Sequence, residues 1–255
     1  QKIKEGKCKV RNKPENISNL DWNLLCQKYD NLDVVISKIN ANYPIAYLIG
    51  DVSFYGYTFK VNENVLIPRF ETETLIEKTI KLIKNLNLEN SNLIDLGTGS
   101  GVIAITLKKE IPSLNIKAID KSQEALNVAI ENSKLNNVNV DFQNQDIFNY
   151  ELPENISIVI SNPPYIEEDS NYNQNVLYEP KEAIFVSNKN PLIYYEQILK
   201  MVKEKINKKH LIAFEIDEDH KEDMYTLCKK YFPNDNVAIE TDLAGKNRYA
   251  FIYSE

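Results

Sequence analysis

The sequence predicts an α/β protein in which helices cover both faces of a mostly parallel β-sheet. Two observations lead to this fold class. From residue 91 onward, strand-like apolar runs alternate with helical patterns, and such a series builds a parallel sheet. The first of these strands is followed by the glycine-rich segment 97–101, and sheets of this kind bind ligands beyond the carboxyl ends of their strands.

Periodicity and turn residues predict the elements in chain order. Apolar residues at helical spacing predict helical structure over 17–40, capped by Ser18 or Asn19, and an amphipathic helix over 71–87. Between them, aromatic and β-branched residues around Gly50 and Gly56 predict a short hairpin within 43–61. In the alternating series, the expected strands are 92–96, 115–120, 138–142, 156–161, 210–216, 236–241 and 248–253, and the expected helices are 101–110, 122–136, 191–206 and 219–231.

Charge and composition restrict the class of protein. The chain of 255 residues has a formal net charge of −7, whereas a protein that grips a nucleic-acid backbone usually presents a basic face. No apolar run approaches the roughly 18 residues of a membrane span, and residues 1–16 lack the apolar stretch of a signal peptide. Cys8, Cys26 and Cys228 are odd in number and lack metal-ligand spacing, which favours free thiols in a reducing cytoplasm.

The segment 92–107 has the pattern of a strand, a glycine turn and a helix. Gly97, Gly99 and Gly101 allow the backbone to turn tightly and let a ligand approach the main chain. Their spacing is G-x-G-x-G, whereas the dinucleotide fingerprint is G-x-G-x-x-G. A nicotinamide cofactor is therefore the weaker interpretation, and a structural glycine turn without a ligand is a further alternative.

Three carboxylates lie at or after the ends of strands that should converge beside this turn. Asp95 lies at the end of the first strand, before the loop, Asp120 lies at the end of the second, 25 residues later, and Asp146 follows the third. A carboxylate before the glycine turn would repel a pyrophosphate but suits a cationic amino-acid ligand such as S-adenosylmethionine. Acidic residues at the place of Asp120 commonly accept ribose hydroxyls, and we expect Asp146 to face the adenine amino group.

The tetrad Asn162-Pro163-Pro164-Tyr165 directly follows the apolar strand 156–161. Its prolines fix an extended backbone and remove two N–H donors, which leaves mainly the Asn162 side-chain oxygen and the Pro163 carbonyl. Two acceptors that face one –NH2 group can hold both of its hydrogens. Tyr165 offers a flat face to a planar amide or base. Two acceptors beside a flat aromatic ring suit methylation of a conjugated nitrogen.

The tetrad also suggests how such a transfer is assisted. Holding both N–H bonds aims the remaining lone pair at the methyl carbon, and the carbonyl dipoles stabilise the positive charge that moves from sulfur to nitrogen. No general base is needed before attack, because the methylated nitrogen is strongly acidic. The tetrad leaves protein glutamine, adenine, cytosine and guanine open as acceptors, and an ordinary proline-terminated strand is the structural alternative.

Several segments together resemble the release factor glutamine methyltransferase family, also called the HemK/PrmC family. The resemblance covers residues 43–255 and rests on a hairpin followed by LIPRFETE, on DLGTGSG and NPPYI, and on YEP at 178–180, FEID at 214–217 and DLAGKNR at 242–248. NPPY alone is shared with nucleic-acid amino methyltransferases, whereas its combination with LIPRFETE and DLAGKNR is more specific. Phe70 and Asp217 depart from the family pattern, which has a proline and a glycine at these places.

The resemblance implies a class I S-adenosylmethionine-dependent methyltransferase fold, Rossmann-like and with seven strands. It implies a helical substrate-recognition domain over 1–48, a hairpin linker over 49–68 and a catalytic domain over 69–255. The implied reaction methylates N5 of the glutamine in the Gly-Gly-Gln loop of peptide chain release factors and yields S-adenosylhomocysteine. Asn162, Pro163 and Tyr165 would be catalytic, and Pro164 would join them in binding the substrate. The implied cofactor site consists of Asp95, Gly97, Thr98, Gly99, Gly101, Asp120, Lys121, Asp146, Ile147, Asn162, Arg69 and Thr72.

Two other classes of function remain as alternatives. A nucleic-acid amino methyltransferase would require a basic groove or an added target-recognition domain, and the sequence indicates neither. An inactive cofactor-binding module would require a damaged glycine turn or tetrad, and both are intact. His210 and His220 have no partner cluster that would bind a metal. We therefore expect a cytoplasmic monomer whose partner is a release factor, with no membrane, metal or nucleic-acid substrate.

Overall fold

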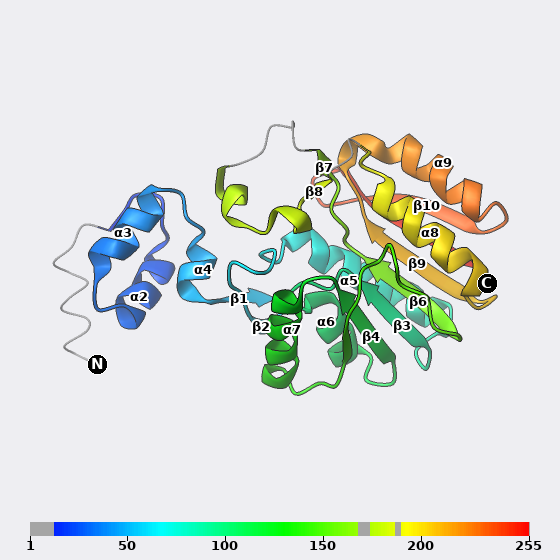
Figure 1. Cartoon of the computed structure of the whole chain (residues 1–255), viewed down its shortest axis with the longest axis horizontal. Coiled ribbons are helices and arrows are strands. Elements are labelled where there is room, and N and C mark those ends of the chain that lie inside the picture. The colour runs from blue at the N-terminus through cyan, green and yellow to red at the C-terminus, as the bar shows by residue number, and fades with distance from the viewer. Residues whose placement is uncertain (1–12, 168–173, 187–189, 255) are drawn as a thin grey trace.

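The computed structural model describes residues 13–167, 174–186 and 190–254. At its centre is a seven-stranded sheet with the strand order β10-β11-β9-β6-β3-β4-β5 (Figure 1). The strands from β9 to β5 run parallel to one another, whereas β11 runs antiparallel to both of its neighbours. The predicted mostly parallel sheet is confirmed.

Most elements of the alternating series lie within a few residues of their predicted ranges. The strands are β3 (Asn92–Leu96), β4 (Asn115–Asp120), β5 (Asp141–Asn144), β6 (Ile156–Ser161), β9 (His210–Glu215), β10 (Asn236–Thr241) and β11 (Asn247–Ser254). The helices are α5 (Phe70–Asn85), α6 (Val102–Glu110), α7 (Gln123–Leu135), α8 (Ile193–Lys205) and α9 (Lys221–Tyr231).

The strand β5 begins later than the predicted range 138–142, and the cause is the turn that closes α7. Asn137 adopts a φ of 54°, and the N–H of Val138 returns to the carbonyl of Ser133 at 3.1 Å. The chain therefore pairs with β4 only from Asp141, which lies opposite Lys117.

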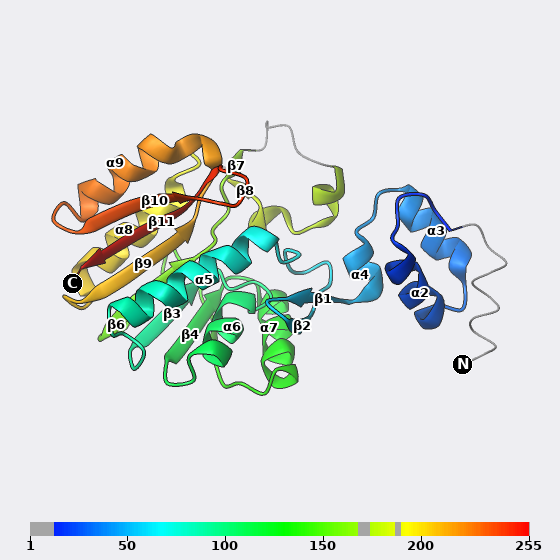
Figure 2. The ribbon, with the colours of Figure 1, turned by 180° about the vertical axis from the view of Figure 1, so that it is seen from behind.

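Helices cover both faces of the sheet, as the view from behind in Figure 2 shows. The helices α5, α6 and α7 lie on one face, and α8 and α9 lie on the other. Successive residues of β3 contribute to two different cores: Leu93 packs on the side of α5 and α6, whereas Ile94 packs on the side of α8 and α9. Burial on both faces explains why these parallel strands are continuous apolar runs rather than alternating patterns.

The helical pattern over 17–40 forms two helices, α2 (Asn19–Lys28) and α3 (Leu32–Asn40). Ser18 caps α2, as predicted, and Asn31 caps α3, each through its side-chain oxygen. Trp22, Leu25 and Ile39 belong to a small core of their own. A second capping residue inside the pattern therefore divides it into a helical hairpin.

The predicted hairpin is present but shorter than 43–61, because its first part is the helix α4 (Ile45–Ile49). The strands are β1 (Asp51–Phe54) and β2 (Tyr57–Lys60), joined by a turn in which Tyr55 and Gly56 both have positive φ. Phe54 and Phe59 are buried in the core beneath α5 and α6. The hairpin is therefore packed against the helices of this face, and the N–H of Lys60 donates to the side chain of Asn132 on α7 at 2.6 Å.

The segment after β6 contains short elements that the sequence did not indicate. They are β7 (Ile166–Glu167), η1 (Gln174–Tyr178), η2 (Lys181–Ala183) and β8 (Phe185–Val186), and η3 (Glu218–His220) precedes α9. The strands β7 and β8 pair in parallel. The hydroxyl of Tyr178 donates to the carbonyl of Ala41 at 2.9 Å, so this segment contacts the N-terminal helices.

The prediction of free thiols is confirmed for one cysteine and wrong for another. Cys228 is free and buried, whereas Cys26 takes part in a disulfide. Cys8 lies outside the described residues. In the ranges that the structure describes, we find no helix with the length and apolarity to cross a membrane. The same ranges contain no group of three or more His, Cys, Asp or Glu arranged to hold a metal ion.

Candidate active site

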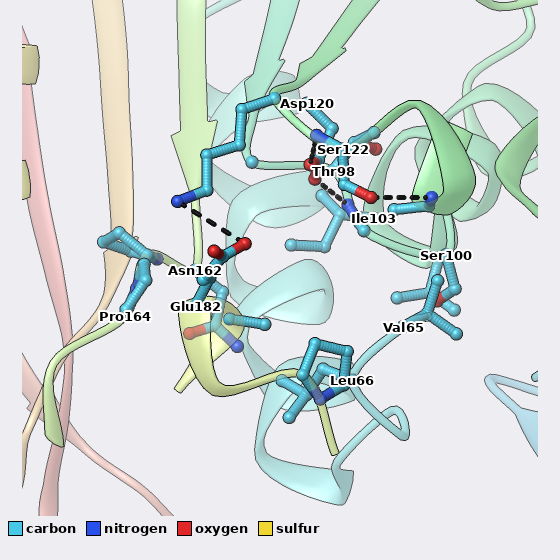
Figure 3. Close-up of a pocket in the computed structure, with 18 of the residues that line it drawn as sticks. Val65, Leu66, Thr98, Ser100, Ile103, Asp120, Ser122, Asn162, Pro164 and Glu182 are labelled. Carbon is cyan, nitrogen blue, oxygen red and sulfur yellow. Dashed lines mark hydrogen bonds and ion pairs between the residues drawn. The ribbon is translucent and has the colours of Figure 1, made fainter. Parts of the chain in front are cut away.

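A pocket lies beyond the carboxyl ends of the parallel strands (Figure 3). Residues that follow β3, β4, β5 and β6 line it, together with residues between 64 and 72. The chain passes from β3 to β4 on one side and returns to β6 on the other side of β3. The pocket therefore lies at the topological switch point, where ligands bind in open α/β sheets.

Gly97 and Gly99 form one wall of the pocket. Their φ angles of 75° and 55° lie in the left-handed region, which glycine adopts more readily than any other residue. A Cβ added to Gly99 would meet nothing within 4 Å, so it would project into open space. Gly101 has a different purpose, because a Cβ there would lie 2.9 Å from Ile105 and 3.1 Å from Ala129. Its lack of a side chain lets α6 approach α7.

The Asp120 carboxylate connects the glycine turn to the end of β4. Its Oδ2 accepts the N–H of Gly99 at 2.8 Å, and its Oδ1 accepts the N–H of Ser122 at 2.9 Å. Burial raises the pKa of this carboxyl, while the Ser122 and Gly99 hydrogen bonds and the charge of Lys121 lower it. A carboxylate oxygen can accept more than one hydrogen bond. Asp120 can therefore also accept hydroxyl groups of a ligand in the pocket.

Asp95 lies behind the glycine turn and does not line the pocket. Its Oδ2 accepts the hydroxyl of Thr98 at 2.6 Å. Its Oδ1 makes no hydrogen bond of ordinary geometry within the described residues. Burial raises the pKa of Asp95 to about 7, although the Thr98 hydroxyl and the N–H of Ala104 oppose this shift. The carboxyl group therefore supports the turn and the start of α6 from behind.

The tetrad begins where β6 ends. The last strand residue, Ser161, is buried, and its hydroxyl donates to the carbonyl of Leu96 at 2.6 Å, which joins the ends of β6 and β3. Asn162, Pro163 and Pro164 line the pocket. Tyr165 does not: its ring packs against the core on the side of α8, and burial raises the pKa of its hydroxyl. The predicted use of Tyr165 as a stacking face is not supported by this position.

A buried carboxylate lies behind the tetrad. Glu215, the last residue of β9, is 2% exposed, and its Oε2 accepts the Thr72 hydroxyl at 2.7 Å. The Nδ2 atom of Asn162 lies 3.4 Å from the same Thr72 oxygen. Burial raises the pKa of Glu215 to about 7, while the Thr72 hydroxyl and the positive charge of Arg248 lower it.

The segment before α5 is fixed by a second buried carboxylate, Glu179. One of its oxygens lies 2.5 Å from the Arg69 guanidinium, and the other accepts the N–H of Ile67 at 2.9 Å. On the same segment, the carbonyl of Val65 accepts the hydroxyl of Tyr47 at 2.6 Å. These contacts hold the backbone that lines the pocket on this side.

An ion pair spans part of the pocket lining, as the dashed line to Glu182 in Figure 3 shows. Lys121 Nζ lies 3.9 Å from Glu182 Oε2, and the Glu182 side chain is 75% exposed. An exposed pair of this length stabilises a protein by at most about 1 kcal/mol. Because this ion pair is weak and exposed, a ligand in the pocket can compete with Glu182 for Lys121.

Residues 70–192 match the model of the methyltransferase small domain family. The release factor glutamine methyltransferase of Flavobacterium psychrophilum is 36% identical over 241 residues, which are 92% of this chain and 81% of that protein. The protein of the same name from Bacillus anthracis is also 36% identical, over 92% of this chain and 85% of its own length. The chain belongs to the release factor glutamine methyltransferase family.

Solved structures agree on the fold. A methyltransferase from Pyrococcus furiosus superposes with a TM-score of 0.56 at 17% identity and covers 87% of this chain and 98% of its own. A 16S rRNA guanine methyltransferase from Thermus thermophilus, solved with AdoMet and guanosine, gives a TM-score of 0.58 at 13% identity, over 80% of this chain and 50% of its own. The predicted class I methyltransferase fold is confirmed.

The pocket brings together most residues that the motifs singled out, and their roles in binding stay predictions. Those that line it are Arg69, Thr72, Gly97, Thr98, Gly99, Asp120, Lys121, Asp146, Ile147, Asn162, Pro163 and Pro164. Asp95, Gly101 and Tyr165 lie outside the lining. Sequence reasoning missed Asn64, Val65, Leu66, Pro68, Ser100, Val102, Ile103, Ser122, Ala125, Gln145, Pro180, Glu182, Ala183 and Tyr194. Several of these residues are next to a motif in the sequence, and this proximity is the signal that could have identified them.

Proposed function

We propose that this protein transfers the methyl group of S-adenosylmethionine to N5 of the glutamine in the Gly-Gly-Gln motif of peptide chain release factors. One observation carries the proposal: Asn162 and Pro163 line the same pocket as Gly97, Gly99 and Asp120. Acceptors suited to an amide –NH2 group therefore lie beside a turn suited to the cofactor. The shared name of the relatives supports the substrate class.

The residues of the pocket fit S-adenosylmethionine. Gly99 leaves open space where any side chain would intrude. Asp120 faces the pocket with oxygens that suit ribose hydroxyls, and Asp146 adds a further carboxyl group to the lining. These acidic groups favour a ligand that carries an ammonium and a sulfonium group. When bound, S-adenosylmethionine supplies a methyl group on a positively charged sulfur, which makes that carbon electrophilic.

The chain's own residues bind and orient the target amide. The Asn162 Oδ1 and the Pro163 carbonyl each accept one hydrogen of the amide –NH2 group, which aims its lone pair and raises the probability of productive alignment. Both oxygens also stabilise the positive charge that develops on nitrogen during transfer. The methylated nitrogen then releases one proton to water. No general base in the protein is required for this order of events.

We assign recognition of the release factor to residues 1–48, a linking role to 49–68 and the chemistry to 69–255. The pocket lining begins at Asn64, so the end of the linking segment contributes to the pocket, whereas none of the described residues 13–48 lines it. Tyr178, from the segment after the tetrad, contacts Ala41 of the N-terminal helices at 2.9 Å. A substrate of the translation machinery would make the protein cytoplasmic, and we propose that it acts as a monomer without a nucleic-acid substrate.

The proposal is tested by methyl transfer from labelled S-adenosylmethionine. The purified protein is offered a release factor, the same factor with the motif glutamine changed to alanine, ribosomal RNA and duplex DNA in parallel. We expect label only in the unmodified release factor. Label in RNA or DNA, with none in the factor, would instead support a nucleic-acid amino methyltransferase. Absence of label in every substrate would indicate a cofactor-binding module.

A further inference from the structure

Three buried or half-buried side chains from different elements meet behind the tetrad. Thr72 lies in the first turn of α5 and is 3% exposed, and Glu215 ends β9 and is 2% exposed. Asn162 follows β6, whose last residue pairs with the residue before Glu215. The Thr72 Oγ1 lies 2.7 Å from Glu215 Oε2 and 3.4 Å from Asn162 Nδ2.

Donor and acceptor chemistry fixes the direction of these contacts. An ionised carboxylate only accepts hydrogen bonds, so the single hydroxyl hydrogen of Thr72 is donated to Glu215. The Thr72 oxygen can then only accept from Asn162, which requires the –NH2 side of the amide to face it. The geometry of these contacts therefore places Nδ2 on the buried side.

We propose that Thr72 and Glu215 are positioning residues that hold the Asn162 amide with Nδ2 against α5 and Oδ1 toward the pocket. The consequence for catalysis rests on the proposed function, in which Oδ1 accepts a hydrogen of the target amide. Without this arrangement the amide can rotate, and its –NH2 group would then face a substrate that needs an acceptor. Thr72 therefore acts through Asn162 rather than on the substrate itself.

Groups from three other elements surround Glu215. Its backbone carbonyl accepts the hydroxyl of Tyr195, from α8, at 2.8 Å. Arg248, on β11, is the cation that faces its carboxylate, and Glu71, on α5, is a nearby like charge. Because burial raises the pKa of Glu215 to about 7, the experiments are run near pH ~8.5, where this carboxyl is largely ionised.

The first experiment observes the amide itself in the protein without substrate. Asparagine is labelled with ¹⁵N, and the side-chain signal of Asn162 is identified by its loss in Asn162→Ala. In Thr72→Val we expect the Nδ2 hydrogens to exchange with solvent roughly tenfold faster than in wild type, because one hydrogen bond is lost. Unchanged exchange would overturn the proposal, whatever the substrate of the enzyme is.

Thr79→Val is the matched control. Thr79 lies on the same helix and is fully buried, but within the described residues its hydroxyl has no hydrogen-bond partner. The same change of hydroxyl to methyl should therefore leave Asn162 exchange unaltered. If Thr79→Val accelerates the exchange as much as Thr72→Val does, the effect reports general loosening and the proposal is wrong.

The second experiment measures methyl transfer to the release factor. We expect Thr72→Val to lower kcat roughly ten- to a hundredfold, because the acceptor is misaligned, and to change the Kd for S-adenosylmethionine much less. Thr72→Ser should restore most of the rate. In an Asn162→Ala background, Thr72→Val should have no further effect, since a residue that acts through another is not additive with it.

These outcomes separate the two proposals. If wild type does not methylate the release factor, the proposed function fails, and the exchange experiment still decides how the amide is held. If wild type is active and Thr72→Val keeps its kcat, or Thr72→Val and Asn162→Ala are additive, the positioning role is wrong while the function stands. Glu215→Gln provides a second variant, expected to slow transfer because its side chain can donate as well as accept.

Discussion

The carboxylate of Glu179 joins the Arg69 guanidinium at 2.5 Å, although the two residues are 110 positions apart in the sequence. Glu179 is 4% exposed, whereas the Arg69 side chain is 39% exposed. The second oxygen of Glu179 accepts the N–H of Ile67 at 2.9 Å. A segment that follows the tetrad thereby fixes the segment that leads into α5, and both contribute to the pocket.

Replacing Glu179 by alanine should release this part of the pocket. The change leaves the Ile67 N–H without its acceptor and Arg69 without its partner, and such losses cost about 1–3 kcal/mol each when buried. Because Arg69 is partly exposed, we expect the loss of its ion pair with Glu179 to lower the free energy of unfolding by an amount in the lower part of that range. Urea unfolding measures the effect. Glu182→Ala, which removes an exposed carboxylate three positions away, should change stability by less than about 0.5 kcal/mol, and equal losses in both variants would contradict the assignment.

Removing α2 and α3 should separate recognition from cofactor binding. A chain that begins at Pro44 keeps Tyr47, whose hydroxyl holds Val65, and keeps the buried Phe54 and Phe59 of the hairpin. We expect calorimetry to show near-normal affinity for S-adenosylmethionine and methylation of the release factor to be lost. The assigned role of the N-terminal helices is wrong if this shortened chain, folded by circular dichroism, methylates the factor at the full-length rate.

The sequence predicted the sheet and the strand ends well because both depend on local patterns. Continuous apolar runs such as 156–161 require burial on both faces, and residues that end parallel strands meet at one edge of the sheet. The residues at these ends, Gly99, Asp120 and Asn162, do converge on the pocket. Their convergence follows from topology alone and needs no knowledge of side-chain packing.

The supporting contacts could not be predicted in the same way. Nothing in the local pattern around Glu215 indicates that it accepts a hydrogen bond from Thr72, 143 positions earlier. Glu179 and Arg69, which also pair, are 110 positions apart. Asp95 was expected in the pocket because it lies near the carboxyl end of β3, but its side chain lies behind the turn and accepts the hydroxyl of Thr98. Alternation along a strand decides which face a residue occupies, and a one-residue difference reverses it.

Gly99→Val should weaken cofactor binding because the new side chain would enter the space beside the turn. Positive φ adds a second effect, since a branched residue with a φ of 55° is strained. Gly245→Val controls for strain, because Gly245 has a φ of 81° and also has nothing within 4 Å of an added Cβ. It lies outside the pocket lining. We expect both variants to lose stability in thermal melts but only Gly99→Val to lose affinity in calorimetry. If the two variants bind S-adenosylmethionine with equal affinity, the glycine turn is not part of the cofactor site.

Asp95→Asn should change how stability depends on pH. Burial raises the pKa of Asp95 from 3.8 to about 7, so between these values the folded protein holds a proton that the unfolded chain releases. Stability contributed by this group is therefore complete at low pH and falls as pH rises toward 7, by up to about 1.4 kcal/mol per pH unit. Asparagine does not titrate. Urea unfolding measures the free energy of unfolding of the variant and of wild type at each pH. The value of the variant minus that of wild type should rise from pH ~4 to ~7 and stay constant above. If the two free energies instead change in parallel with pH, Asp95 ionises normally.

Asn162→Ala should slow methyl transfer far more than it weakens cofactor binding. The variant loses an acceptor that orients the target amide and stabilises charge in the transition state, and loss of one such preorganised contact costs about 10²–10³ in rate. The alternative is that Asn162 only stabilises the end of β6, but its side-chain amide faces Thr72 of another element. That alternative predicts a lower melting temperature with little change in the rate of folded molecules. Single-turnover methylation of a release factor, with melting temperature measured in parallel, distinguishes them.

Asn92→Ala, which removes an asparagine hydrogen bond to Asn155 at the opposite end of the sheet, should keep the wild-type rate. If Asn162→Ala also keeps the wild-type rate of methyl transfer, Asn162 does not hold the amide of the target glutamine. The proposed mechanism then loses the first of its two hydrogen-bond acceptors.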